Sequence, residues 1–112
     1  IKMGNVSFLG KVIQGVPPRE LKNIVDGFKK EVGSGIVSVA GSFENKASLV
    51  VGVTEDLCGK YDAVALVKHG VTALDGKGGG GRPDMAQAGG SNVENLSGAI
   101  ERIKDFVALM KQ

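Results

Sequence analysis

Residues 36–54 read IVSVAGSFENKASLVVGVT, two apolar runs on either side of the short polar segment Glu44-Asn45-Lys46. The runs, residues 36–43 and 47–54, are rich in Val and Ile, which favour strands, so the segment predicts a β-hairpin. The second run is apolar at successive positions, and therefore on both of its alternating faces. Because such a strand is typical of one that is buried on both sides, residues 47–54 are expected to form a central strand.

The segment before this hairpin predicts a strand followed by a helix. Residues 5–16 are rich in branched and aromatic side chains and are interrupted by two glycines, as in a bent or bulged strand. Pro17 and Pro18 end that strand and suit the first turn of a helix. The helix is expected to end at Gly33 and Gly35. Its apolar stripe comprises Leu21, Ile24, Val25, Phe28 and Val32.

The segment after the hairpin predicts two more helices and a short strand. Residues 54–59 indicate one turn of helix, and Asp62 is expected to cap the helix that follows it. Residues 85–88 are expected to form a short strand. Ser91 and Glu94 have the S-x-x-E spacing of a capping box at the start of the last helix. The apolar stripe of that helix comprises Val93, Leu96, Ile100, Ile103, Val107 and Met110.

These elements predict the order β-α-β-β-α-(β)-α in a single globular domain that covers residues 1–112. We expect an α/β (α+β) fold in which helices flank a small mixed sheet. The chain has 112 residues, 42% of them apolar, which is enough for one hydrophobic core. It begins with Ile1 rather than methionine, so we expect it to be a segment of a longer protein.

Composition narrows the classes of function. The net charge of +2 fits a domain that binds nucleic acid within a larger protein, although many other binding domains carry a similar charge. With four Phe, one Tyr and no Trp, stacking of bases on aromatic platforms is not expected to be the main mode of recognition. A single cysteine, Cys58, allows no internal disulfide and favours a reduced, cytoplasmic setting. The sequence has no signal-peptide pattern and no apolar run long enough for a membrane helix.

Seven of the eighteen glycines lie in residues 76–90, GKGGGGRPDMAQAGG. One interpretation is a loop whose backbone N–H groups face an anion, with Lys77 and Arg82 supplying charge. The other is a flexible or tightly packed connector whose glycines allow close contact between a helix and the sheet. The segment does not fit a dinucleotide fingerprint, because it follows a predicted helix, nor a Walker A loop, because Arg82 and Pro83 follow the last glycine of the run.

Other polar residues have simpler interpretations. His69 is the only histidine and has no partner at metal-ligand spacing, so a satisfied or solvent-facing helix histidine is expected. Cys58 is expected to be a small buried residue rather than a nucleophile. The acidic pair Glu55-Asp56 is expected to cap a helix or lie in a solvated turn. The lysine group Lys22, Lys29 and Lys30 is expected to be a solvated helix face, with phosphate contact as the alternative.

The string GGGGRPDMAQAGG at residues 78–90 resembles the signature of the C-terminal domain of alanyl-tRNA synthetase. That domain is the DHH-associated domain, which is also the second domain of DHH-type phosphoesterases. The predicted elements follow the order of that domain over nearly the whole chain. The phosphoesterase form of the motif has histidine after the glycines, where this chain has Arg82, and the DHH motif itself is absent.

The resemblance implies a non-catalytic module of an ATP-dependent alanine–tRNA ligase, one that contacts the elbow of tRNA(Ala). It also implies a contribution to aminoacylation, editing and dimerisation, with other domains of the same synthetase and a possible homodimer as partners. No cofactor is expected in this segment, while the parent enzyme would use ATP, Mg and Zn. The helical subdomain that precedes this module in the family is not recognised here. The alternative is the substrate-binding domain of a DHH-type phosphoesterase.

On this interpretation, the glycine-rich segment and the neighbouring helix supply the RNA contacts. They would face phosphates and 2′-hydroxyl groups, and the glycines would let one backbone approach the other. The candidate RNA-binding residues are Lys77, Arg82, Lys68, His69, Gln87, Gly78, Gly79, Gly80 and Gly81.

Overall fold

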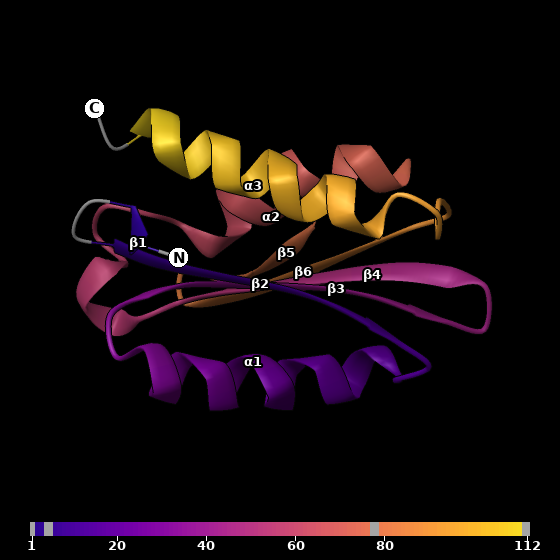
Figure 1. Ribbon diagram of the computed structural model, residues 1–112, viewed down its shortest axis with the longest axis horizontal. Helices are drawn as coiled ribbons and strands as arrows, with labels where there is room; N and C mark the ends of the chain where they lie inside the picture. Colours follow the sequence, from indigo (N-terminus) through magenta and orange to yellow (C-terminus); the bar gives the residue numbers. More distant parts are fainter. Residues whose placement is uncertain (1, 4–5, 77–78, 111–112) are drawn as a thin grey trace.

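The computed structural model describes residues 2–3, 6–76 and 79–110, which form three layers (Figure 1). One helix covers one face of a sheet, and two helices cover the other face. The predicted α+β class, a small mixed sheet flanked by helices, is confirmed. Two of the predicted site residues, Lys77 and Gly78, lie outside the described residues.

The sheet has six strands in the order β1-β2-β3-β4-β6-β5, and all neighbours are antiparallel except the parallel pair β2 and β3. The predicted hairpin forms its centre, and β4 lies between β3 and β6, as expected of a central strand. The strands are β1 Lys2–Met3, β2 Val6–Gln14, β3 Gly35–Phe43, β4 Lys46–Val53, β5 Gly80–Arg82 and β6 Met85–Gly90.

The first helix starts and ends at the predicted prolines and glycine, and the second starts at the predicted cap. Helix α1, Pro18–Val32, connects the parallel strands and ends at Gly33, whose φ is 72°. Helix α2, Ala63–Val71, starts at Asp62, whose side chain accepts a hydrogen bond from the Val64 N–H (2.9 Å). Single helical turns η1, Glu55–Leu57, and η2, Thr72–Leu74, flank α2, and α3 spans Leu96–Met110.

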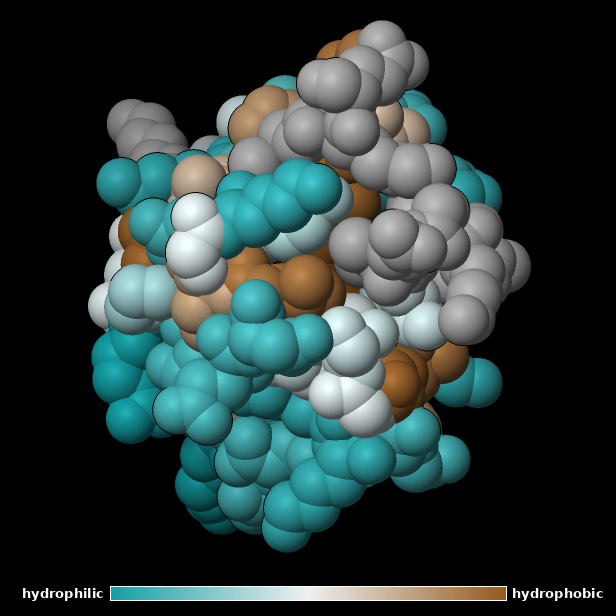
Figure 2. Space-filling view, turned by 90° about the vertical axis from the view of Figure 1, so that its left-hand side faces the viewer, coloured by the Kyte–Doolittle hydropathy of each residue, from teal (hydrophilic) through white to brown (hydrophobic). Residues whose placement is uncertain are grey.

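Two hydrophobic clusters separate the layers. The larger one packs α2 and α3 against the sheet and includes Leu49, Val51, Leu66 and Ile103. The smaller one packs α1 against the other face through Leu21, Val25, Val39 and Val50. Hydrophilic side chains cover the lower part of the molecule, where α1 lies, and hydrophobic atoms reach the surface at the level of the sheet (Figure 2). Within residues 2–3, 6–76 and 79–110, no helix has the length and apolar content to cross a membrane.

The structure corrects two local predictions. The glycine-rich segment was expected to be a loop with a short strand inside it, but Gly80–Arg82 and Met85–Gly90 pair as an antiparallel hairpin. Helix α3 begins at Leu96, so Ser91 and Glu94 do not form its capping box. The side chain of Asn92 instead accepts a hydrogen bond from the Glu94 N–H (3.0 Å), which holds this segment in a turn before the helix.

Candidate nucleic-acid interface

The hairpin of β5 and β6 is held by its turn, Pro83-Asp84. The Val53 N–H donates to the Asp84 carbonyl (2.9 Å), and the Ala63 N–H donates to the Pro83 carbonyl (2.9 Å). The Lys29 Nζ group of α1 also donates to the Asp84 carbonyl (3.1 Å). Three separate elements therefore fix the turn, and the hairpin is presented as a rigid edge of the sheet.

The strand register determines which face each side chain of the hairpin occupies. Arg82 lies opposite Met85, and Gln87 lies opposite Val50. Met85 and Val50 belong to the cluster under α1. Because opposite residues in an antiparallel pair share a face and side chains alternate along a strand, Arg82 and Gln87 both project toward the α1 side.

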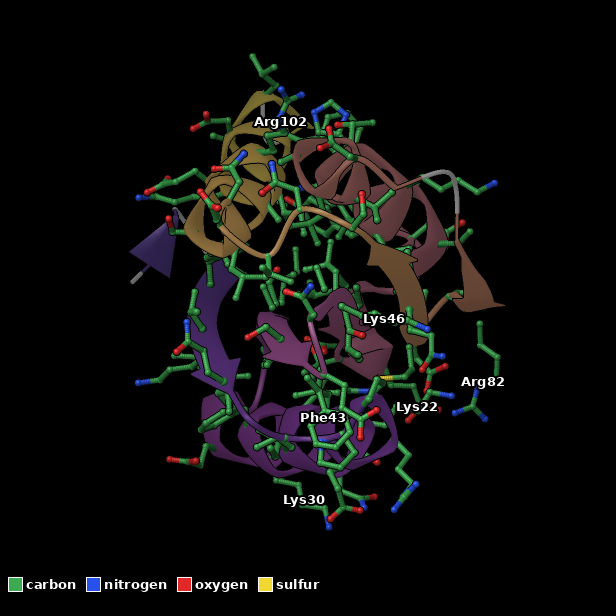
Figure 3. All side chains as sticks on the ribbon, turned by 90° about the vertical axis from the view of Figure 1, so that its right-hand side faces the viewer. Lys22, Lys30, Phe43, Lys46, Arg82 and Arg102 are labelled. Carbon is green, nitrogen blue, oxygen red and sulfur yellow. The ribbon has the colours of Figure 1, made fainter. Side chains whose placement is uncertain are left out.

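Helix α1 does not cover this part of the sheet. It packs on β2, β3 and β4, while β6 and β5 extend beyond it (Figure 3). A hollow of about 260 Å³ lies here, lined by Pro18, Ser48, Val50, Gln87, Ala88 and Gly89. The α1-facing side of β4 and β6 forms the floor of this hollow, Pro18 of α1 borders it, and the same face of the sheet continues to Gly80 and Arg82 of β5 as an exposed surface. We call the hollow and this surface together the hairpin groove.

The glycines of the segment divide into two groups. A Cβ at Gly79 would lie 2.8 Å from the Ala88 Cβ and 3.0 Å from a Val67 methyl group, and one at Gly90 would collide with the Leu74 carbonyl. Gly81 has φ 147°, which favours glycine. By contrast, a Cβ at Gly80 would meet nothing within 4 Å, and one at Gly89 only the Ala47 carbonyl at 3.5 Å. The interpretation of a tightly packed segment therefore applies to Gly79 and Gly90, while Gly80 and Gly89 leave space for a side chain or a ligand.

Positive side chains lie around the hairpin groove, and two of them share the carboxylate of Asp84. The side chain of Arg82 is 75% exposed, and its Nε lies 3.4 Å from Asp84 Oδ1. Lys29 is largely buried, with Nζ 3.8 Å from the other oxygen of the same carboxylate. Lys22 and Lys46 are exposed. Lys46 lies further along the sheet, six residues before Gly52, the residue of β4 that is level with Arg82. Since exposed ion pairs are weak, a phosphate could compete with Asp84 for Arg82.

The predicted site residues do not form one surface. Gly80, Arg82 and Gln87 lie together on the hairpin groove, whereas Lys68 and His69 belong to α2, on the other face of the sheet. The His69 ring stacks on Phe106 of α3, with ring centroids 4.3 Å apart and an interplanar angle of 20°. His69 is thus packed against another helix while remaining exposed to solvent, as the simpler interpretation expected.

Two groove residues were not among the predicted contacts. Lys22 was interpreted first as a solvated lysine of α1, and Lys46 was seen only as part of the hairpin turn. Strand alternation could have indicated Lys46, since residues 46, 48, 50 and 52 must share one face of β4. That signal gives no indication that the covering helix stops short of β6.

The remaining polar candidates are accounted for by local structure. Burial raises the pKa of the Cys58 thiol, and the nearby Asp84 carboxylate adds to this effect, which disfavours the thiolate that a nucleophile needs. Hydrogen bonds from Ser34 (2.5 Å) and Thr54 (2.7 Å) lower the pKa of Asp56. Asp56 therefore ties the start of β3 to η1, which agrees with its expected role at a turn. Across the described part of the chain, His, Cys, Asp and Glu side chains form no group of three or more that could hold a metal ion.

Comparison with known proteins gives one consistent picture. A family model described as the DHHA1 domain matches residues 5–109. The alanine–tRNA ligase of Chelativorans sp. (strain BNC1) is 49% identical over 108 residues, and that of Rhizobium meliloti (strain 1021) is 51% identical over 107 residues. These matches cover 96% and 95% of this chain but only 12% of each relative.

Among solved structures, the crystal structure of the C-Ala domain from Aquifex aeolicus alanyl-tRNA synthetase matches with a TM-score of 0.88 and 28% identity. The match covers 96% of both chains. The resemblance inferred from residues 78–90 is confirmed by the family match, the relatives and the fold.

Proposed function

The chain belongs to the DHHA1 domain family, and on that premise we propose that it is the tRNA-binding C-terminal module of an alanine–tRNA ligase. The relatives that share about half of its sequence are alanine–tRNA ligases, which favours this function over the substrate-binding domain of a phosphoesterase. Ligation, with its ATP, Mg and Zn, would then be carried out by other domains of the cytoplasmic parent. The module would assist aminoacylation, editing and dimerisation.

The observation that carries the proposal is the exposed Arg82 beside Gln87 and Gly80, on the side of the hairpin that faces away from α2 and extends beyond α1. A guanidinium group can bind a phosphate through two parallel hydrogen bonds, which fixes position as well as adding affinity. Gln87 can hydrogen-bond a 2′-hydroxyl group, and Gly80 offers no side chain that would keep the RNA backbone away. Lys22 and Lys46 extend the positive charge along the groove.

The folded outer corner of tRNA suits this surface better than a regular duplex does. The contacts follow shape and backbone charge, because the groove offers few side chains that could read the edges of bases. With few phosphates neutralised, binding is expected to be modest and to weaken steadily as salt increases.

The test measures binding of a tRNA(Ala) transcript to the 112-residue chain by fluorescence anisotropy at a series of salt concentrations. Arg82→Ala is expected to weaken binding about five- to tenfold and to reduce the slope of log K against log salt by about one. Arg102→Ala is the matched control, because Arg102 is an exposed arginine on α3, where it bonds Thr72 (3.2 Å). A minihelix that lacks the elbow should bind much less tightly than the full tRNA.

Two results would contradict the proposal. One is tRNA binding that does not change with salt. The other is a folded Arg82→Ala variant that binds as well as the unmodified chain, while Arg102→Ala binds less well.

A further inference from the structure

The hairpin groove deepens at the end away from Arg82. A hollow of about 430 Å³ lies against the turn between β3 and β4, and it adjoins the hollow of about 260 Å³ over β4 and β6. Pro18, Ser48 and Gly89 line both hollows, so the two are continuous. We call the larger hollow, against the turn between β3 and β4, the end pocket. The larger hollow is within the size range of small-ligand sites.

The end pocket is separate from the Arg82 site. Gly52 lies opposite Met85, which in turn lies opposite Arg82, so Arg82 is level with Gly52. Ser48 precedes Gly52 by four residues on the same strand, a distance of about 13 Å along an extended chain. A ligand that spans both sites must therefore be longer than a single phosphate.

The lining of the end pocket combines ring faces with a few polar groups. Phe43 and Pro18 supply apolar rings, and the Phe43 ring is only partly buried. Ser48 supplies a hydroxyl group between them, and Gly89 leaves the floor without a side chain. Such a site suits a flat heterocycle with polar edges.

One lysine and one glutamate line the end pocket, and a second lysine lies nearby on α1. Lys46 lines it, and Lys22 is exposed one helical turn after Pro18. Glu44 is the acidic group of the lining. Figure 3 shows Phe43 and Lys46 at the end of the molecule that faces the viewer, with Lys22 beside them and Arg82 further to the right.

We propose that the end pocket holds one unpaired nucleobase of the bound RNA, an inference that rests on the proposed function. The base would lie against the Phe43 and Pro18 rings, with its edge toward Ser48 and its phosphate toward Lys46 or Lys22. The adjoining backbone would continue along the groove to Arg82. Since bases in a regular duplex stay stacked inside it, the pocket selects RNA that has a base turned outward.

The experiment compares two RNAs bound to the 112-residue chain. One is a fully paired hairpin, and the other is the same hairpin with a single bulged 2-aminopurine. The bulged RNA is expected to bind about tenfold more tightly, because stacking of one base on an aromatic ring contributes on the order of this factor. The fluorescence of its 2-aminopurine should change on binding.

Filling the pocket provides the decisive variant. Gly89→Val should remove the preference for the bulged RNA, so that the variant binds the bulged and the paired hairpin with similar affinity. The fold is expected to tolerate it, because a Cβ there meets only one atom at ordinary contact distance, and valine suits a strand. Gly59→Val is the control, since a Cβ at Gly59 meets nothing within 4 Å and lies outside the pocket lining. Phe43→Leu is a second variant, for use if Gly89→Val is unstable. It keeps an apolar wall but should lose most of the preference for the bulged RNA, because the aromatic ring is gone.

The outcomes separate the two proposals. Two outcomes overturn the base pocket while leaving the tRNA-binding function in place. One is equal affinity of the unmodified chain for both RNAs. The other is a preference for the bulged RNA that persists in folded Gly89→Val and Phe43→Leu variants. Failure of both RNAs and of tRNA(Ala) to bind at low salt overturns the function and the pocket together. Arg82→Ala should weaken both RNAs by the same factor, so a selective loss of the bulged RNA would also contradict the arrangement.

Discussion

The two sides of the β5–β6 hairpin differ, although the same glycine-rich segment forms both. On the α2 side, Gly79 has no room for a side chain, because Val67 and Ala88 lie against it. On the α1 side, Gly80 and Gly89 have open space around them, and Arg82 projects into solvent. A run of glycines can therefore pack closely on one side and leave the backbone open on the other, provided that alternate residues face the two sides.

The closed side also explains how the open side keeps its shape. Close packing against α2 and the three hydrogen bonds to the Pro83-Asp84 turn hold the hairpin without any contribution from the exposed side chains of Arg82 and Gln87. These two exposed side chains can then be changed at little cost in stability. Stability should therefore depend on the α2 side of the hairpin, and RNA binding on the α1 side.

The largest effect is expected from a pair of neighbouring glycines. Gly79→Ala should reduce the free energy of unfolding by about 2 kcal/mol, since the added methyl group overpacks the contact with Val67 and Ala88. Gly80→Ala should change it by less than about 0.5 kcal/mol, because the new Cβ meets open space. Urea unfolding of both variants measures the difference, and equal stabilities would show that the two sides are not distinct.

A smaller effect is expected from the lysine that supports the turn. Lys29→Met should reduce stability by about 1 kcal/mol, because the Asp84 carbonyl loses a charged donor and the carboxylate loses a partner. Lys30→Met is the control, since Lys30 is exposed on the same helix and lies away from the groove in Figure 3. Thermal melting compares them. If the two variants melt together, Lys29 does not hold the hairpin.

A charge change on the open side should affect binding more than stability. Asp84→Asn should raise affinity for tRNA(Ala) about threefold, because Arg82 loses an exposed ion-pair partner that competes with phosphate. The gain should disappear in the double variant with Arg82→Ala. A gain of the same size in the absence of Arg82 would mean that Asp84 repels RNA through its overall charge instead.

The smallest effect concerns pH and a site remote from the groove. The folded-state pKa of Asp56 is lowered by Ser34 and Thr54, so its contribution to stability is complete above the unfolded pKa of about 4 and is lost as pH falls through the folded pKa. Asp56→Asn should therefore flatten the dependence of stability on pH below about pH 4. The difference in free energy of unfolding between Gly79→Ala and Gly80→Ala should stay constant over the same pH range. If that difference varied with pH, the Asp56 turn and the β5–β6 hairpin would be energetically coupled.

Much of the fold follows from apolar periodicity. The two runs around Asn45 gave the central hairpin, and its turn has the positive φ values of such connections at Glu44 (50°) and Asn45 (65°). The stripe of α1 and the Asp62 cap gave two of the helices. Strand β1 was missed because two residues, Lys2–Met3, are too short to show a pattern.

The candidate site was less predictable. Glycines carry no side chain, so their sequence shows no alternation and gives no indication of which face each residue occupies. The predicted contacts therefore mixed Arg82 and Gln87 with Lys68 and His69, which lie on the helix layer across the sheet. The predicted capping box was wrong because the Glu94 N–H bonds the side chain of Asn92 in a local turn. The S-x-x-E spacing alone cannot exclude such a turn.

Mapping of backbone amide chemical shifts on the ¹⁵N-labelled chain during titration with tRNA(Ala) tests the central claim most directly. We expect the largest changes at Gly80, Arg82, Gln87 and Gly89, and little change on the outward surface of α2 and α3 around His69 and Arg102. Changes concentrated around His69 and Arg102, with the hairpin groove unaffected, would contradict the claim.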